Sequence, residues 1–324
     1  MHYIEKLRNK LEGKLIQTHA SWVIVTDEVV YKIKKPVNFG FLDYSTLEKR
    51  KYFCEKEIVL NRRLCPYIYL GVVPISLIND EWHLEDDTNI VEYAVKMRRI
   101  KEENLLSNML EEGSIKREHI IKIAETVAHF HLSAEKAPDY GKKEIMRFNT
   151  DENFEQVKPF VGETIGKEDF ELIKRKTEYF YRKYDHLFKK RIVEGKIVDG
   201  HGDIRLEHIA FLEDCICIFD CIEFNDRFRC GDMVNDMCFL SVELDFRGRE
   251  DLSNLYESCY VNITKDEDFY SVLPFFKSYR AFVRGKVYSF LSKDKFADGD
   301  TKKRAKDTAL RFFKLSKKYA ENIS

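Results

Sequence analysis

The sequence has little proline, little glycine and no long hydrophobic run. Its 324 residues include 6 Pro and 14 Gly, and no segment is rich in Ser, Gly and Pro, which argues against a disordered linker. No run of about 18 apolar residues occurs, the length that a membrane-spanning helix needs. The length allows two lobes, so we expect two lobes joined by a short hinge and no association with a membrane.

The sequence also lacks an excess of charge of either sign and any regular cysteine pattern. It has 55 basic and 56 acidic residues and a formal charge of -1, so no overall field attracts nucleic acid, and we expect no nucleic-acid partner. The 8 cysteines form no CxxC pair and no framework of the kind found in small secreted domains. The charged opening segment, residues 1–14, does not resemble a signal peptide. Together these features predict a reduced cytoplasmic protein.

The first hundred residues have the pattern of a small sheet. Runs of β-branched and aromatic residues predict strands at 15–18, 22–25, 29–33, 71–78, 81–85 and 90–98. Turns are expected at Asn79-Asp80 and Asp86-Asp87. One helix, 49–64, is expected after the capping box Ser45-Thr46-Leu47-Glu48. Residues 1–98 therefore predict an antiparallel lobe with one long helix.

From residue 99 onward the pattern is mainly helical. Helices are expected at 114–131, 152–163, 167–190, 249–263, 267–293 and 300–321. Short β segments are expected at 197–198, 208–212 and 215–219, the last two joined by a Glu213-Asp214 turn. The fold class is therefore α+β, with a sheet lobe at 1–98 and a helical lobe at 99–324.

The most informative segment runs from Val198 to Asp220. It places Asp203 and Asp220 at the two ends of a loop and a β-hairpin, and a hairpin brings its ends close together. In the kinase catalytic loop an Asp accepts the proton of the substrate hydroxyl, a metal ligand follows five positions later, and a metal-binding Asp follows a strand pair. Asp203, His208 and Asp220 occupy these positions, with His201 as support for the loop. Because imidazole suits Mn²⁺ better than Mg²⁺, His208 makes either cation a candidate, and Glu223 is a further candidate ligand.

Phosphoryl transfer also needs a cation on the ATP phosphates and an acid that holds this cation in place. Lys32 lies between apolar residues in the strand 29–33, and Glu57 lies in the helix that follows. Glu55 is a competing acid on the same helix. We prefer Glu57 because it precedes Leu64, at the end of the helix, by one heptad.

The sequence suggests a position or a contact for four further residues of the first hundred. Met97, near the end of the sheet, is expected to line a purine pocket, although a place in the core explains it equally well. No G-x-G-x-x-G loop occurs, so Ser21 and nearby backbone N–H groups are expected to contact the phosphates. Lys34 and Lys35 are expected to be solvated residues at a strand edge.

The second part of the chain contains two polar pairs of interest. Asp232 follows a glycine and precedes an apolar helix, so it is expected to cap that helix or to support the catalytic loop, and Asp236 has the same structural interpretation. Arg280 and Arg284 lie four residues apart on one helix face, which suits an anion or a carboxylate of the acceptor.

The triplet His201-Gly202-Asp203, with Gly where protein kinases have Arg, resembles the loop of aminoglycoside phosphotransferases and related small-molecule kinases. The resemblance extends over Thr18-His-Ala-Ser-Trp-Val, Tyr31-Lys-Ile-Lys-Lys-Pro-Val-Asn-Phe-Gly-Phe-Leu-Asp-Tyr, Leu60-Asn-Arg-Arg-Leu, Tyr69-Leu-Gly-Val-Val-Pro, Phe219-Asp-Cys-Ile-Glu-Phe-Asn and Tyr279-Arg-Ala-Phe-Val-Arg-Gly-Lys-Val. Almost the whole chain is similar to an uncharacterised bacterial branch of aminoglycoside phosphotransferase-like proteins, some fused to a P-loop ATPase. No G-x-x-x-x-G-K-[ST] motif occurs here, so no fused P-loop domain is expected. The resemblance implies a two-lobed protein-kinase-like fold and ATP binding more firmly than any acceptor. It implies that residues 1–98 form the nucleotide-binding lobe and that residues 99–324 carry the catalytic loop and the acceptor site.

Three functions are compatible with these residues. The first is transfer of the γ-phosphate of ATP, with Mg²⁺ or Mn²⁺, to a hydroxyl of a small molecule, which Gly202 favours. The second is a nucleotide-binding pseudokinase, which His208 and the missing glycine loop would permit. The third is a phosphohydrolase with two metals about 4 Å apart, held by His201, Asp203, Asp220, Asp232 and Asp236. It ranks last because it leaves Lys32 and the N-terminal sheet unexplained.

Overall fold

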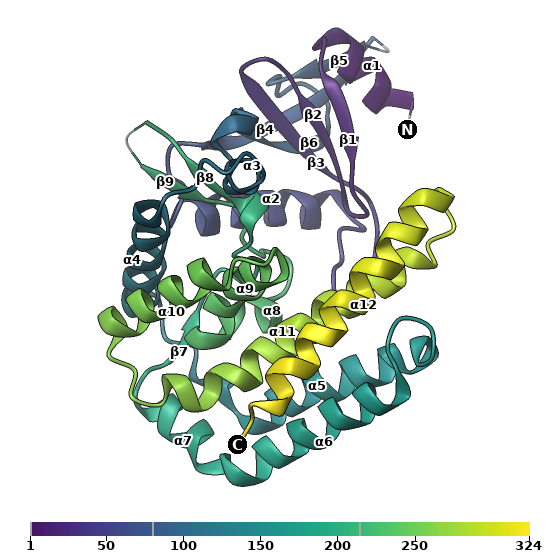
Figure 1. Ribbon diagram of the computed structural model, residues 1–324. Coiled ribbons are helices and arrows are strands. Elements are labelled where there is room, and N and C mark those ends of the chain that lie inside the picture. Colours follow the sequence, from purple (N-terminus) through teal and green to yellow (C-terminus); the bar gives the residue numbers. More distant parts are fainter. Residues whose placement is uncertain (1, 80, 214) are drawn as a thin grey trace. The chain divides into compact units, whose positions relative to one another are not determined.

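An antiparallel sheet dominates the first part of the computed structural model, which describes residues 2–79, 81–213 and 215–324 (Figure 1). Among these residues it has six strands in the order β1-β2-β3-β6-β4-β5. Their bounds are β1 Lys14–Gln17, β2 Ser21–Val25, β3 Val29–Lys34, β4 Tyr69–Ile78, β5 Glu81–Leu84 and β6 Ile90–Arg98. All the expected strands of this sheet are thus confirmed, while Asp80 and Asp214 of the expected turns lie outside the described residues.

Two helices accompany the sheet. Helix α1 (His2–Lys10), which we did not anticipate, packs Ile4 and Leu7 into the core on the sheet. Helix α2 (Leu47–Asn61) is the expected long helix, but Thr46 caps it by accepting a hydrogen bond from the Lys49 amide at 3.3 Å. The N-cap is therefore Thr46 and not Ser45, the first residue of the predicted capping box, because the Ser45 hydroxyl donates to Asp43 at 2.6 Å instead.

The catalytic segment forms the expected hairpin. A 3₁₀ turn, η4 (Leu206–His208), leads into β8 (Ile209–Phe211), which pairs antiparallel with β9 (Ile216–Ile218). Two short elements from an earlier part of the chain, η1 (Glu102–Asn104) and α3 (Leu106–Glu111), lie beside this hairpin, since Leu105 between them bridges to Ala210 on β8. A short helix, α8 (Asp226–Arg229), ends the segment.

The remaining residues are mostly helical. The helices are α4 Arg117–Ser133, α5 Lys143–Val157, α6 Lys167–Lys183, α7 Asp185–Val193, α9 Met233–Phe246, α10 Glu250–Thr264, α11 Phe269–Ser292 and α12 Gly299–Glu321. Shorter elements are η2 Pro138–Gly141, η3 Lys158–Phe160, and the strands β7 Ile197–Asp199 and β10 Cys230–Asp232, which pair with each other. Helices α11 and α12 lie close together, since a Cβ added at Gly285 would lie 2.8 Å from the Phe313 ring.

Three expected helices differ from those observed. The helix predicted to open at Ser114 begins at Arg117, and the one predicted at 152–163 is α5, which ends at Val157. The long helix predicted at 167–190 is two helices, because the chain leaves helical geometry at Tyr184.

Contacts divide the chain into two compact units. Residues 1–115 and 201–229 form the first unit, and residues 116–200 and 230–324 form the second. This grouping differs from the division at residue 98 that we expected. The hairpin segment groups with the sheet because, for example, the Cys221 amide donates to Asn61 at the end of α2 at 2.9 Å.

The sulfur atoms of Cys65 and Cys217 are paired as a disulfide, with Cα atoms 4.6 Å apart. This distance lies in the range that disulfides occupy. The expectation that all cysteines are reduced is therefore not met at this pair, because two residues 152 positions apart in sequence meet in one hydrophobic cluster of the first unit.

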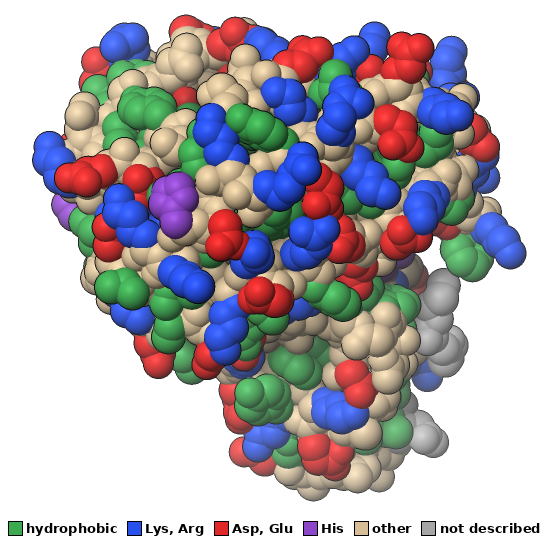
Figure 2. Space-filling view, turned by 90° about the horizontal axis from the view of Figure 1, so that it is seen from below, with side chains coloured by type: hydrophobic (Ala, Val, Ile, Leu, Met, Phe, Trp, Pro, Cys, Tyr) green, Lys and Arg blue, Asp and Glu red, His purple; other side chains and the backbone are tan. Residues whose placement is uncertain are grey.

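Charged residues of both signs are mixed over the face drawn in Figure 2, without a large area of one sign. Among the described residues, no helix is long and apolar enough to cross a membrane.

Candidate active site

A cavity of about 800 Å³ lies within the first unit, between residues of the sheet and residues of the catalytic segment. Its lining brings together six of the residues that the sequence singled out: Ser21, Lys32, Met97, Asp203, Asp220 and Glu223. The sheet contributes the first three and the catalytic segment the last three, so the two most informative parts of the sequence face one space.

Lys32 on β3 connects two carboxylates at this cavity. Its Nζ lies 2.9 Å from Glu57 Oε1 and 2.7 Å from Asp220 Oδ1. Glu57 is fully buried, whereas the side chain of the competing Glu55 is 55% exposed and lies 3.9 Å from Lys51. The structure thus brings together the pair chosen from the sequence.

The charges of this group reinforce one another. Burial alone would lower the pKa of Lys32, but Asp220 and Glu57 outweigh it and hold the pKa well above its usual value. Loss of solvent would raise the pKa of Asp220, yet the Lys32 ammonium holds that pKa well below its usual value. Lys32 is therefore a cation and Asp220 an anion over the whole physiological pH range.

Lys34 is the most informative residue that the sequence analysis missed. We expected a solvated edge lysine, and this is wrong: Lys34 is fully buried, and its Nζ donates to Glu57 Oε2 at 2.7 Å and also to Glu223 Oε1. Strand β3 lies between β2 and β6 and is not an edge. Since side chains two apart on a strand face the same side, Lys34 and Lys32 both reach Glu57. The spacing of two residues between Lys32 and Lys34 is the sequence signal from which the burial of Lys34 could have been predicted.

Glu223, a candidate metal ligand, is part of the same buried group. Its Oε1 accepts hydrogen bonds from Lys34 and from the Tyr44 hydroxyl, the latter at 2.5 Å. Burial would raise the pKa of Glu223, but Lys34 and then Lys32 lower it. The structure therefore places Glu223 in an ion pair with Lys34, and its role as a metal ligand stays a prediction.

Asp203 and His208 are held by a second missed residue, Arg205. Arg205 Nε lies 2.9 Å from Asp203 Oδ1, and its guanidinium also lies 2.6 Å from Glu207 Oε1. The Nδ1 of His208 lies 2.9 Å from the Asp203 carbonyl, which can only accept, so Nδ1 carries the proton. Nε2 is then the acceptor for Arg205 Nη2, at 3.1 Å. Both nitrogens of His208 are thus engaged inside the loop.

His201 and Gly202 shape the turn that presents Asp203. His201 is buried, its carbonyl accepts from the Ile222 amide at 3.1 Å, and its Nδ1 accepts from the Asp203 amide at 3.3 Å. Gly202 has φ +85°, and an added Cβ would lie 2.9 Å from the Phe228 carbonyl oxygen. Only glycine meets both conditions without strain, which explains the His-Gly-Asp triplet in physical terms.

The chemistry of the donors at Asp220 fits a divalent cation beside nucleotide phosphates. Lys32 binds Oδ1, while Oδ2 lies 3.5 Å from His208 Nε2. Mg²⁺ is commonly bound by one or two carboxylates together with phosphate oxygens, an arrangement to which Asp220 can contribute. Among the described residues, no group of three or more His, Cys, Asp or Glu side chains is placed to hold a metal.

Two expected nucleotide contacts also lie at the cavity. Ser21 is buried, and its amide donates a hydrogen bond to Thr18 Oγ1 at 2.9 Å, which closes a tight turn. Met97, partly buried on β6, packs against the hydrophobic cluster around Val95 and Tyr69. Their contacts with adenine and phosphate stay predictions.

The polar residues of the second unit have structural partners. Asp232 caps α9 by accepting from the Val234 amide at 2.9 Å, as expected, and its Oδ1 also accepts from Arg191 at 2.8 Å. Asp236 Oδ2 lies 3.0 Å from His131 Nε2. These contacts account for both acids without a metal.

The two arginines proposed for an anion are also engaged. Arg280 is buried, donates to the Asn235 carbonyl at 3.1 Å and stacks on Phe239 with its Cζ 3.7 Å from the ring centroid. Arg284 lies 3.4 Å from Glu243 Oε1. Contact with an acceptor therefore stays a prediction for both.

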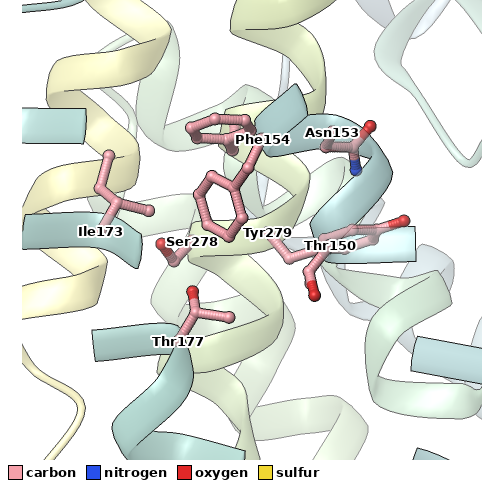
Figure 3. A pocket seen from close by; sticks show the side chains of 8 residues that line it. Thr150, Asn153, Phe154, Ile173, Thr177, Ser278 and Tyr279 are labelled. Atoms are coloured by element: carbon pink, nitrogen blue, oxygen red, sulfur yellow. The ribbon is translucent and has the colours of Figure 1, made fainter. Parts of the chain in front are cut away.

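A small cavity of about 10 Å³ lies in the second unit and has room for about one water molecule (Figure 3). Polar and apolar side chains surround it, among them Thr150, Asn153, Phe154, Thr177 and Ser278. It is too small for a substrate.

Comparison with known proteins places the chain in a structural context. No protein-family model matches it. An uncharacterised protein of Mycobacterium tuberculosis (strain ATCC 25618 / H37Rv) is 31% identical over 275 residues, which are 84% of this chain and 53% of that protein. The chain therefore spans about half the length of the curated relatives it matches.

Solved structures share its fold across nearly the whole chain. A choline kinase from Cryptosporidium parvum Iowa II has a TM-score of 0.58 at 12% identity, covering 97% of this chain and 91% of its own. The amicoumacin kinase hAmiN in complex with AMP-PNP, Ca²⁺ and Ami has a TM-score of 0.54 at 11% identity, covering 97% and 96%. A putative aminoglycoside phosphotransferase from Ralstonia eutropha JMP134 has a TM-score of 0.52 at 14% identity, covering 97% and 98%.

The chain therefore has the two-lobed protein-kinase-like fold of choline kinases and aminoglycoside phosphotransferases. This confirms the two-lobed protein-kinase-like fold class that the sequence predicted.

Proposed function

We propose that this protein is a cytoplasmic, ATP-dependent phosphotransferase that moves the γ-phosphate to a hydroxyl group of a small molecule. The observation that carries the proposal is Lys32, which joins Glu57 and Asp220 at a cavity that Asp203 also lines. A lysine paired with a helix acid, a metal-binding Asp and a catalytic Asp are the parts that kinases use. The structures of similar fold are named as kinases or a phosphotransferase of small molecules, and one holds AMP-PNP and Ca²⁺, which supports a nucleotide and a divalent cation here.

Each residue of the site has a separate role in the proposed transfer. Lys32 would bind phosphate oxygens of ATP while Glu57 holds it in place, and Ser21 and Met97 would contact phosphate and adenine. Asp220 would hold Mg²⁺ or Mn²⁺, which when bound offsets the charge that develops on the phosphates. The acceptor oxygen forms a bond to the γ-phosphorus as the bond from that phosphorus to the bridging oxygen of ADP breaks. Asp203 accepts the proton of the acceptor hydroxyl, and Arg205 fixes the orientation of its carboxylate.

A nucleotide-binding pseudokinase is the second candidate, because both nitrogens of His208 are engaged by the loop at the position where kinases have a metal-binding Asn. A phosphohydrolase is the weaker third candidate, since Asp232 and Asp236 pair with Arg191 and His131.

The test combines ATP binding with transfer. Thermal unfolding is measured with and without ATP and Mg²⁺, and transfer from γ-labelled ATP is measured against a panel of amino alcohols, aminoglycosides and other hydroxyl compounds. We expect a stabilising shift that Lys32→Ala and Asp220→Ala strongly reduce, with Glu55→Gln on the exposed face of α2 as the matched control.

Asp203→Asn separates the candidates. The proposal requires that this variant keep the ATP-dependent shift while transfer falls by about 10² or more, the size typical of a lost general base. Binding without transfer to any compound would favour the pseudokinase, and hydrolysis of ATP with binding lost in Asp203→Asn would favour the hydrolase. No shift in the unmodified protein would contradict the proposal.

A further inference from the structure

We infer that Lys34 is a positioning residue that fixes Glu57, and through it Lys32, for phosphoryl transfer. The inference rests on the proposed function and deepens it by adding a second lysine to the site. It also assigns Glu223 as the counter-ion of Lys34.

The geometry ties both oxygens of Glu57 to β3. Oε1 lies 2.9 Å from Lys32 Nζ and Oε2 lies 2.7 Å from Lys34 Nζ. The carboxylate cannot turn about its axis without losing one of these contacts, and full burial of Glu57 and Lys34 leaves no solvent to replace it. A single lysine would leave Oε2 without this partner, so the second lysine sets the orientation of the acid that holds the first.

The charges require Lys34 as well. The group contains three carboxylates, from Asp220, Glu57 and Glu223, and two ammonium groups, from Lys32 and Lys34. Its formal charge is therefore +2 - 3 = -1. Without Lys34 the charge becomes +1 - 3 = -2, and removing one partner of a buried ion pair is strongly destabilising because it leaves an uncompensated charge.

Loss of Lys34 would change the position of Lys32. In this structure Lys32 is shared between Glu57 and Asp220. When its ammonium group turns to phosphate oxygens, Glu57 is the contact that keeps it in place, and Lys34 keeps Glu57 from following. Loss of Lys34 should let Glu57 turn towards its remaining lysine and draw Lys32 away from the phosphates.

The central variant is Lys34→Met, which keeps the length of the side chain and removes its charge. We expect kcat/KM for ATP to fall by on the order of ten- to hundredfold, the effect typical of a small misplacement of a reacting group. Lys34→Arg keeps the charge and should lose less than Lys34→Met. The matched control is Lys10→Met on α1, whose exposed Nζ donates to the Trp82 carbonyl at 3.0 Å and does not line the cavity. Its kinetics should equal those of the unmodified protein.

A second variant covers the case in which Lys34→Met does not fold. In Lys34→Met/Glu223→Gln the formal charge returns to +1 - 2 = -1, while Glu57 Oε2 still lacks Lys34. The inference requires that this double variant, once folded, retain the loss in kcat/KM. Kinetics like those of the unmodified protein in either folded variant would overturn it, because Lys34 would then serve stability alone.

A crystal structure of the nucleotide-free variant provides a readout that does not depend on catalysis. The separation of Lys32 Nζ from Glu57 Oε1, or the orientation of the Glu57 carboxylate, should differ from the arrangement described above. An unchanged pair would overturn the positioning role. Absence of any ATP-dependent activity in the unmodified protein would instead contradict the proposed function, while the crystallographic comparison would still decide the role of Lys34.

Discussion

Gly202, in the turn that presents Asp203, gives a prediction whose size follows from two separate features of the structure. Its φ of +85° is unfavourable for any residue with a Cβ, and an added Cβ would lie 2.9 Å from the Phe228 carbonyl oxygen and 3.1 Å from Arg229 Cα. The left-handed conformation costs roughly 1–2 kcal/mol, and overpacking against backbone that cannot yield adds about 1–3 kcal/mol. Gly202→Ala should therefore lower the free energy of unfolding by about 2–5 kcal/mol, the sum of these two ranges.

Gly40 offers a matched control for the first contribution. It has φ +82°, but nothing lies within 4 Å of an added Cβ, so Gly40→Ala should cost only the conformational part, roughly 1–2 kcal/mol. The assay is urea unfolding of both variants and of the unmodified protein. Their free energies of unfolding are compared once the slope of free energy against urea concentration is found to be the same in all three. The reasoning is refuted if Gly202→Ala costs no more than Gly40→Ala, because the contact with Phe228 would then carry no energy. If it is correct, Gly202→Ala should also reduce transfer without loss of ATP binding, since the turn presents Asp203 and not Lys32.

Three further predictions concern the disulfide, the response to pH and His208. Reduction of the disulfide should lower the free energy of unfolding, measured in urea, by up to about 5 kcal/mol, the chain-entropy value for a loop of 152 residues. Cys215→Ser, at a free cysteine of the same hairpin, should change this free energy little. Equal stability of the oxidised and reduced forms would show that the bond does not constrain the unfolded chain. The depressed pKa values of Asp220 and Glu223 stabilise the fold at pH values above the ordinary pKa of a carboxyl group. This stability is lost as pH falls through the pKa values of the folded protein. The raised pKa values of Lys32 and Lys34 stabilise the fold below about pH 10.5, and this stability is lost as pH rises further. Unfolding free energy should therefore fall at both extremes, and in Lys34→Met/Glu223→Gln both limbs should be shallower; unchanged limbs would remove this group as their source. Because both nitrogens of His208 are engaged by the loop, His208→Asn should leave the ratio of activity with Mn²⁺ to activity with Mg²⁺ unchanged, and a fall in this ratio would show that the ring turns to bind the cation.

Local signals in the sequence were enough to predict the sheet and the hairpin. Alternation and turn residues predicted the strands of the sheet because polar turns separate several of them and β2, β3, β4 and β6 each bury some of their side chains. The long helix predicted at 167–190 failed because the periodicity continues through Tyr184, where the backbone changes direction without a proline or glycine to signal it.

The residues that sequence reasoning missed at the site depend on tertiary contacts. Lys34 resembled a surface lysine because nothing near it in sequence is acidic, while its partners Glu57 and Glu223 lie 23 and 189 positions away. The partner of Cys65 is similarly distant in sequence. Arg205 is different: it lies two residues from Asp203 and could have been considered, but its contacts with both Asp203 and His208 depend on the 3₁₀ turn that follows.

The contacts around Asp220 bear on how such a site could be regulated. Many kinases control activity by moving the helix that carries the glutamate, so that the lysine–glutamate pair forms only in the active state. Here the segment after β9 is attached to that helix and its surroundings at several points: the Ile218 amide donates to the Leu64 carbonyl at 3.3 Å, and the Asp220 amide donates to the Tyr69 hydroxyl at 3.2 Å. The Asn61 side chain at the end of α2 accepts from the Cys221 amide.

These attachments make a displaced α2 costly. To move α2 away from β3, the protein would have to break the contacts of Glu57 with two lysines and leave buried charges unpaired, which costs several kcal/mol. Asp220 itself is held at φ +61°, a conformation unfavourable for a non-glycine residue that persists only where its surroundings enforce it. The lysine–glutamate pair is formed in this structure, so control of activity by movement of α2 would have to overcome these contacts.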